Sequence, residues 1–319
     1  MKKIHIITLV LVLLWVVTGC GNQANSDQKT TNLTMGVEPW IGYGPWWIAD
    51  KKGIFKKNGL NVKITTFKQD SDINAAFASD KIKVANIASH TAIKMKGNNG
   101  IDLKSIVFLD ESQTADAVIS TKKYQSLDQL KGKKVAFEEG TTSDLLFRQA
   151  LKAHHLTITD FKIVYMPASD AGLALSSGKV DAAVTYEPYI ASITAKNASI
   201  HSIYTAKQSA GLISDVAAVK QSYLAKNKSI KSKLQKSWKE SLSYWEKHKK
   251  EGNAIIAEAT GTPSDQLPTI LKGLKFFSLE EQKDRQDELL KGYENIEKIL
   301  LAQKTLKKAI DVSELLDMK

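Results

Sequence analysis

Short runs of β-branched and other apolar residues alternate along the chain with longer stretches whose apolar positions recur at helical spacing. The short runs fall at 35–37, 84–88, 135–137 and 182–184, and a polar or glycine-containing loop follows each of them. This alternation predicts parallel strands joined by crossover helices, because a parallel connection needs a dozen or more residues, usually a helix. We therefore predict an α/β protein with mixed, mostly parallel sheets that are flanked by helices.

The alternating pattern occurs twice in the chain. Residues 76–85 (AFASDKIKVA) align with residues 174–183 (ALSSGKVDAA), which are 98 positions further along. The same offset aligns 35–37 with 133–135, and Gly42 with Gly140. Each copy contains a strand, a glycine-bearing loop, an amphipathic helix, a strand, a helix and a strand. Two copies of such a unit predict two α/β lobes.

The repeat sets the predicted domain organisation. We expect one lobe to begin at 32–110, a second lobe to occupy 111–204, and residues 205–319 to return to the first lobe and end in helices. Helical spacing in this last part predicts the following helices: 222–250, 253–260, 264–273, 279–301 and 303–316.

Capping signals and aromatic spacing add detail to this prediction. Residues 126–129 (SLDQ) and 278–281 (SLEE) each match a capping box, and Pro263 is expected at a first helical position. Trp238 and Trp245 fall on one face of the helix predicted at 222–250. This face is expected to pack against the first lobe.

The first 20 residues match the layout of a secretory signal that ends in a lipidated cysteine. Two lysines precede an apolar run, and Cys20, the only cysteine of the chain, follows Gly19. About 14 apolar residues span only ~21 Å as a helix, short of the ~30 Å hydrocarbon core, which disfavours an uncleaved membrane anchor. We predict a signal peptide at 1–19, lipidation of Cys20, for example with palmitate, and a polar tether at 20–31. The protein is then expected on the outer face of the cytoplasmic membrane.

The chain is basic, with 45 Lys and Arg residues against 34 Asp and Glu residues and a formal charge of +11. Nearly all the basic residues are dispersed lysines, and Arg148 and Arg285 are the only arginines. The sequence contains neither zinc-finger spacing nor an RNA-binding aromatic motif. We therefore predict a solvated lysine-rich surface and no nucleic-acid partner.

Four segments that follow predicted strands form the candidate ligand-binding site. In open α/β sheets, ligands bind at the carboxyl ends of strands, beside helix N-termini. Two segments come from each predicted lobe, so a cleft between the lobes would bring all four together. The candidate ligand-binding residues are Trp40, Ile41, Gly42, Tyr43, Ser89, His90, Thr91, Asp110 (at the crossing to the second lobe), Gly140, Thr141, Thr142, Ser143, Tyr186 and Glu187.

Signals for catalysis and metal binding are weak in this sequence. His154 and His155 have no Cys or carboxylate at metal-ligand spacing, and His90 is remote from any Ser or Cys nucleophile motif. The sequence contains no Gly-x-Ser-x-Gly, P-loop or His-Glu-x-x-His motif. We predict a binding protein without a metal, a cofactor or an enzymatic activity.

Three stretches of the sequence carry a likeness to a known family. They are GYGPWWIA with KGIFKKNGL within 42–60, KGKKVA with GT within 131–141, and SGKVDAAV with EPY within 177–189. Through them the chain resembles the nitrate/sulfonate/taurine family of ABC-transporter substrate-binding lipoproteins, and the likeness covers nearly all of the mature chain. One departure is Lys83, where such proteins often carry an aspartate, as Asp181 does in the second unit.

The resemblance implies a type II periplasmic-binding-protein fold, in which two lobes close on a small solute about a two-strand hinge. It also implies delivery of the solute to a membrane permease that a cytoplasmic ATPase powers. We expect a monomer that closes about a hinge near 110–114 and 203–206.

The sequence leaves the chemistry of the solute open. Helix N-termini and hydroxyl groups can hold an oxyanion without arginine. However, Glu38, Asp110, Glu111, Glu139 and Glu187 all lie near predicted strand ends. If two or more of them face the cleft, they would repel a bare anion such as nitrate. A solute that carries an amine, such as taurine or a thiamine pyrimidine precursor, would then fit better.

Two other classes of protein fit the sequence less well. An enzyme that resembles the yeast-type thiamine pyrimidine synthase relies on a cysteine-rich motif, and the mature chain holds no such motif. A lipid-anchored adhesin or interaction protein would not need paired pocket loops from two lobes.

Overall fold

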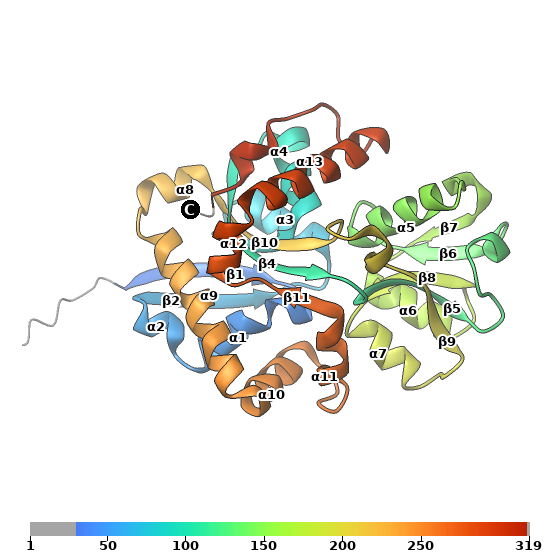
Figure 1. Ribbon diagram of the computed structural model, residues 1–319, viewed down its shortest axis with the longest axis horizontal. Helices are drawn as coiled ribbons and strands as arrows, with labels where there is room; N and C mark the ends of the chain where they lie inside the picture. Colours follow the sequence, from blue (N-terminus) through green and yellow to red (C-terminus); the bar gives the residue numbers. More distant parts are fainter. Residues whose placement is uncertain (1–29, 318–319) are drawn as a thin grey trace, which may run out of the picture.

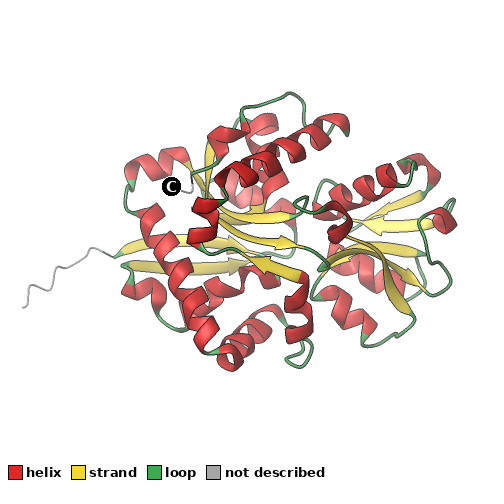
Figure 2. Cartoon of the chain, viewed as in Figure 1, coloured by secondary structure: helices red, strands yellow, loops and turns green. Residues whose placement is uncertain are grey.

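The computed structural model describes residues 30–317, which form two mixed β-sheets with helices on both faces of each (Figures 1 and 2). In Figure 1 the first sheet lies on the left, and the second, in green and yellow, lies on the right. The predicted signal peptide at 1–19, Cys20 and most of the tether at 20–31 lie outside the described residues. Within 30–317, no helix is long and apolar enough to cross a membrane.

The first sheet has six strands in the order β11-β4-β10-β3-β1-β2. Strands β1 to β4 run in one direction and β10 and β11 in the other, so the sheet is mixed, as predicted. It is not mostly parallel, because β10 and β11 make its three antiparallel pairings and only two pairings are parallel. The strands are β1 (Thr31–Val37), β2 (Leu60–Thr66), β3 (Val84–Ala88), β4 (Leu103–Ser112), β10 (Ser214–Lys220) and β11 (Leu274–Phe276).

The second sheet repeats this arrangement with five strands in the order β7-β6-β8-β5-β9. Its strand β5 pairs antiparallel with both neighbours, as β10 does in the first sheet. In each sheet this reversed strand is the one that the chain enters after crossing from the other sheet. The strands are β5 (Asp116–Thr121), β6 (Lys134–Phe137), β7 (Lys162–Tyr165), β8 (Ala182–Tyr186) and β9 (Ile200–Thr205).

The sequence repeat corresponds to a repeat in structure. Helix α3 (Asp70–Ala78) and helix α6 (Ala168–Ser176) begin and end 98 residues apart, and the same holds for β3 and β8. Strand β1 pairs with β2 and β3 as β6 pairs with β7 and β8, all in parallel. The prediction of two related α/β units is therefore confirmed.

Helices cover both faces of both sheets, and each face of the first sheet carries its own hydrophobic core. Alternate residues of one strand enter different cores: Val216 belongs to the same core as Phe77 and Tyr293, whereas Ala217 belongs to the core of Met35 and Trp238. The remaining helices are α1 (Gly44–Lys51), α2 (Ile54–Lys57), α4 (Ser89–Asn99), α5 (Thr142–Ala153), α7 (Tyr189–Thr194), α8 (Gln221–Lys226), α9 (Ile230–Lys247), α10 (Lys249–Thr260), α11 (Leu267–Ile270), α12 (Leu279–Asp284) and α13 (Gln286–Ala302).

The chain crosses between the sheets at 113–115 and again at 206–213. These crossings are tied to each other and to the segment before β11. The backbone N–H of Ser112 donates to the carbonyl oxygen of Ile213 at 3.0 Å, and the N–H of Gln113 donates to that of Gly273 at 2.8 Å. The hydrogen bonds hold the two crossing segments side by side.

Several predicted helices of the C-terminal part differ in the structure. The prediction of a helix at 303–316 is wrong, because only a 3-10 turn, Val312–Leu315, forms in that stretch. The helix expected at 222–250 is divided into α8, α9 and the start of α10, and α8 ends before Asn227. Trp238 and Trp245 of α9 are buried, and the ring of Trp238 lies 4.8 Å from that of Trp46 in the first lobe, as predicted.

The capping predictions are partly confirmed. Ser278 and Glu281 form the expected capping box at the start of α12. The box predicted at 126–129 is wrong: only a 3-10 turn forms there, and the side chain of Gln129 accepts a bond from the N–H of Gln125. Pro263 does not begin a helix, since α11 begins at Leu267.

Candidate binding site

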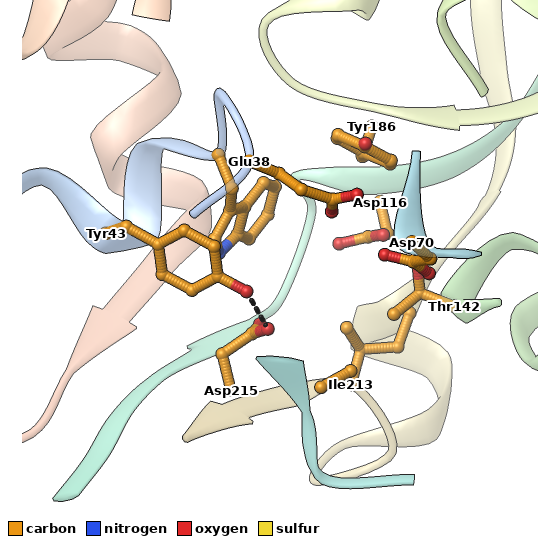
Figure 3. Close-up of a pocket in the computed structure, with 10 residues that line it drawn as sticks. Glu38, Tyr43, Asp70, Asp116, Thr142, Tyr186, Ile213 and Asp215 are labelled. Atoms are coloured by element: carbon orange, nitrogen blue, oxygen red, sulfur yellow. Dashed lines mark hydrogen bonds between the residues drawn. The ribbon is translucent and has the colours of Figure 1, made fainter. Parts of the chain in front are cut away.

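A cavity lies between the two sheets, at the edge where the strands of both sheets end (Figure 3). Its empty volume is about 320 Å³, and this figure includes space open to solvent at its mouth. The lining residues are Glu38, Trp40, Tyr43, Asp70, Ala88, Asp116, Thr142, Tyr186, Ile213 and Asp215.

The strand directions explain why these residues meet. Glu38 directly follows β1, and Ala88 and Tyr186 are the last residues of β3 and β8. Strands β5 and β10 run the opposite way, so their first residues lie at the same edge. Asp116 begins β5 and Asp215 is the second residue of β10, which brings both carboxyl groups into the cavity.

Aromatic side chains form one wall of the cavity and anchor two carboxyl groups. The indole N–H of Trp40 donates to Asp110 at 3.1 Å, and the hydroxyl of Tyr43 donates to Asp215 at 2.7 Å. The Trp40 ring meets the ring of Tyr186, from the second sheet, edge-to-face at 5.7 Å. Residue 42 must be glycine here, because a Cβ would lie 2.1 Å from Asp110 Oδ2.

The carboxyl groups around the cavity have raised pKa values. Burial raises the pKa of Asp116 to about 7 and that of Asp215 to about 8, because the ionised forms lose water. Burial and the neighbouring Asp70 raise the pKa of Glu38 well above its ordinary value. Burial and the charge of Asp215 do the same for Asp110. The empty cavity therefore favours protonated carboxyls near neutral pH.

Two basic side chains near the cavity, Lys94 and His90, have lowered pKa values, and neither of them lines the cavity. Lys94 on α4 donates to the carbonyl oxygen of Gly140 at 2.7 Å. Burial, with the charge of Lys94 as a second cause, lowers the pKa of His90 to about 3, so its imidazole is neutral.

The glycine loop before α5 is organised mainly by its own hydrogen bonds. Gly140 has a φ of 76°, a left-handed conformation that glycine adopts without strain, and its N–H donates to Asp144 at 2.9 Å. The hydroxyl oxygen of Thr141 caps α5 by accepting a bond from the N–H of Ser143 at 3.3 Å. Thr142 is the residue of this loop that lines the cavity.

Four of the residues predicted from the sequence line the cavity: Trp40, Tyr43, Thr142 and Tyr186. The others lie around it, and their contact with a ligand stays a prediction. Ser89 is bonded to Ser214, and Glu187 accepts a bond from the N–H of Ala191 at the start of α7. The remaining predicted residues outside the lining are Ile41, Gly42, His90, Thr91, Asp110, Gly140, Thr141 and Ser143.

Six residues of the lining are not among the candidates that the sequence suggests. Of these, Glu38 is recognisable in the sequence only as an acid near a strand end. Asp116 and Asp215 stand at the starts of strands, whereas the candidates come from strand ends, and a prediction of which strands are reversed would have found them. The six residues are Glu38, Asp70, Ala88, Asp116, Ile213 and Asp215.

Despite the number of acidic groups, residues 30–317 contain no cluster of three or more His, Cys, Asp or Glu side chains placed to hold a metal ion. The site consists of hydrogen-bonding and aromatic side chains that both sheets contribute to one cavity.

A family model with the description "NMT1/THI5 like" matches residues 40–252, about two thirds of the sequence. The chain belongs to this family. The match includes β2 to β10 and all of the lining residues except Glu38.

Similar proteins agree with membership of the NMT1/THI5-like family. A candidate aliphatic sulfonates-binding protein of Bacillus subtilis is 28% identical over 205 residues, which are 62% of this chain and 60% of that protein. A candidate binding protein of the same species, YtlA, is 25% identical over 244 residues, covering 74% and 72% of the two chains. The chain thus matches less than two thirds of the length of the first of these relatives.

Solved structures show the fold of this NMT1/THI5-like chain. The periplasmic aliphatic sulphonate binding protein SsuA of Escherichia coli has a TM-score of 0.71 at 18% identity, over 89% of this chain and 96% of that one. A Candida albicans protein with the generic periplasmic binding protein fold has a TM-score of 0.73 at 13% identity, over 91% and 97%. The predicted periplasmic-binding-protein fold is confirmed.

Proposed function

We propose that the protein is the extracytoplasmic solute-binding component of an ABC importer, and that it captures a small polar solute of the sulfonate, taurine and nitrate class between its two lobes. The cavity carries this proposal, because both sheets contribute side chains to it at their strand ends. The fold and the relative named for aliphatic sulfonates support the same function. The protein would act by binding and release, without enzymatic chemistry.

The partners follow from this role. A membrane permease would receive the solute, and a cytoplasmic ATPase would drive its import. Lipidation of Cys20 would hold the monomeric protein on the outer face of the cytoplasmic membrane, with 20–31 as a tether.

A solute that carries an amine, such as a thiamine pyrimidine precursor, is the second candidate. The observation that favours it is the group of carboxyls that lines the cavity: Glu38, Asp70, Asp116 and Asp215. In their ionised form these carboxyl groups attract protonated amines and repel bare oxyanions.

Thermal melting of the purified protein with sulfonates, taurine, nitrate and aminopyrimidines tests this proposal. A solute at 100 times its dissociation constant adds ~2.7 kcal/mol to the protein's free energy of unfolding. The melting temperature of the protein then rises by several degrees. Uptake of the stabilising solute by cells with and without the gene then tests transport. Uptake that is equal in the two strains contradicts the proposed function.

A further inference from the structure

Two carboxylate oxygens in the cavity wall have no hydrogen-bond partner. They are Oε1 of Glu38 and Oδ2 of Asp116, on side chains that are 7% and 3% exposed. Figure 3 shows both carboxyl groups turned toward each other and toward Asp70. A buried polar group without a hydrogen-bond partner destabilises the protein, and more so when it is charged. A bound solute that donates hydrogen bonds to these oxygens would remove this cost.

The charges around the cavity favour a cation over an anion. Four carboxyl groups line the cavity and no Lys, Arg or His side chain does, among residues 30–317. The ammonium group of Lys94 is bonded to Gly140 O, and the imidazole of His90 is neutral. Once these carboxyl groups are ionised, they would repel a bare oxyanion, and the wall carries no basic side chain to oppose that repulsion.

The other lining groups suit an organic cation. The rings of Trp40, Tyr43 and Tyr186 line the same space, and aromatic rings attract cations as well as apolar groups. The N–H of Trp40 and the O–H of Tyr43 are already bonded to Asp110 and Asp215. Among the lining carboxyls, Glu38 and Asp116 each keep one buried oxygen without a partner, which can accept a bond from a solute.

We propose that the solute carries a protonated N–H group, a primary or secondary ammonium or an amidinium, which donates hydrogen bonds to Glu38 and Asp116. Trp40 and Tyr186 contact its carbon skeleton. This inference rests on the proposed function and narrows its solute class. Taurine carries such a group, whereas ethanesulfonate and nitrate carry no amine and are not expected to bind.

Binding of such a cation is coupled to release of protons. Burial raises the pKa of Asp116 to about 7 and that of Asp215 to about 8, so the unliganded protein keeps protons there at neutral pH. A cation favours the ionised carboxylates, so affinity increases as the pH rises from 6 to 8. The titratable and charged groups that face this cluster are Glu38, Tyr43, Asp70, His90, Lys94, Asp110, Glu138, Tyr186, Glu187 and Tyr189.

Matched probes test the inference on the purified protein by thermal melting at constant ionic strength. Methylammonium is compared with tetramethylammonium, which has the charge but no N–H, and taurine is compared with ethanesulfonate, which has the sulfonate but no amine. We expect methylammonium and taurine to raise the melting temperature more than their partners do. Titration calorimetry with taurine in two buffers of different ionisation enthalpy should show proton release.

Two variants locate the effect and a third serves as a control. Asp116→Asn and Glu38→Gln should each weaken taurine binding by about tenfold or more, since a hydrogen bond to a charged group contributes about 1.5–3 kcal/mol. Glu111→Gln is the matched control: it removes a carboxylate that accepts a bond from the N–H of Gly211, outside the cavity lining. This variant should bind taurine as the unmodified protein does.

The outcomes separate the inference from the proposed function. Stabilisation by ethanesulfonate or nitrate that equals or exceeds that by taurine overturns the inference and leaves the proposed function standing. The inference is also overturned if methylammonium gives the same melting temperature as tetramethylammonium and taurine gives the same melting temperature as ethanesulfonate. Loss of taurine stabilisation in Asp116→Asn and Glu38→Gln but not in Glu111→Gln supports it.

Discussion

The ammonium group of Lys94 lies 2.7 Å from the carbonyl oxygen of Gly140, and this bond joins helix α4 beside the first sheet to a loop of the second. The Trp40 and Tyr186 rings meet across the same gap at 5.7 Å. Both contacts require the two lobes to be close together. The described conformation is therefore one in which the lobes are closed over the cavity.

Replacing Lys94 with Met should favour an open arrangement of the lobes. The substitution keeps a long apolar stem but removes the bond to Gly140, and a charge-assisted hydrogen bond contributes about 1.5–3 kcal/mol. We expect a larger radius of gyration in small-angle scattering and weaker solute binding by about tenfold or more.

Lys96→Met is the matched control for this change. Lys96 lies two positions further along α4, and its ion pairs are with Asp102 and Glu314, away from the second sheet. The Lys96→Met variant should have the same radius of gyration and the same affinity for the solute as the unmodified protein. If Lys94→Met gives the same radius and affinity as Lys96→Met, the bond to Gly140 does not hold the lobes together.

Replacing Cys20 with Ser should release the protein from the membrane without changing its fold. The lone cysteine closes a lipobox-like run and would be the site of acylation. Described packing begins at Thr31, where the N–H is bonded to Gly59 O, so the substitution touches no described contact. Cell fractionation and metabolic labelling with palmitate measure the effect. A variant that stays in the membrane fraction and keeps its label contradicts lipidation at this residue.

The sequence predicts the fold well because the repeat and the alternation of elements are local patterns. The equivalence of 76–85 and 174–183 is enough to relate α3 to α6 and β3 to β8. The helix predicted at 303–316 fails for a tertiary reason: Leu306 is instead buried against Gly97 on α4, and the carbonyl oxygen of Thr305 accepts a bond from Asn98.

The cavity is harder to predict, because its composition depends on strand direction. Trp40, Tyr43, Thr142 and Tyr186 follow or end strands that run toward the cavity, so their positions at strand ends indicate them. Asp116 and Asp215 come from reversed strands, whose direction is set by where the chain crosses between sheets. No local pattern in the sequence carries that information.

Replacing Gly42 with Ala should damage both the aromatic wall and the stability of the protein. The added Cβ would lie 2.1 Å from Asp110 Oδ2 and 2.3 Å from Trp40 Nε1, so the bond between these two groups cannot persist. Asp110 is fully buried, and a buried carboxyl that loses its partner costs about 1–3 kcal/mol or more. Denaturant unfolding should show this loss. Gly292→Ala, where a Cβ meets no atom within 4 Å, is the control and should leave stability equal or higher. Equal stability of the two variants would contradict the close packing at residue 42.

The pH dependence of stability provides a further test of the buried carboxyl cluster. Burial raises the folded-state pKa of Asp116 to about 7, whereas an unfolded Asp titrates near ~3.9. Between these values the folded protein binds more protons than the unfolded chain, so stability from this group is full below about pH 4 and is lost as the pH rises to about 7. Asp116→Asn removes the titration, and its advantage over the unmodified protein should grow across this window toward a limit on the order of 4 kcal/mol. Urea unfolding of both proteins at a series of pH values measures the difference. A difference that stays constant from pH 4 to pH 8 would show that folding does not raise the pKa of Asp116. A difference that falls with rising pH would show that folding lowers this pKa.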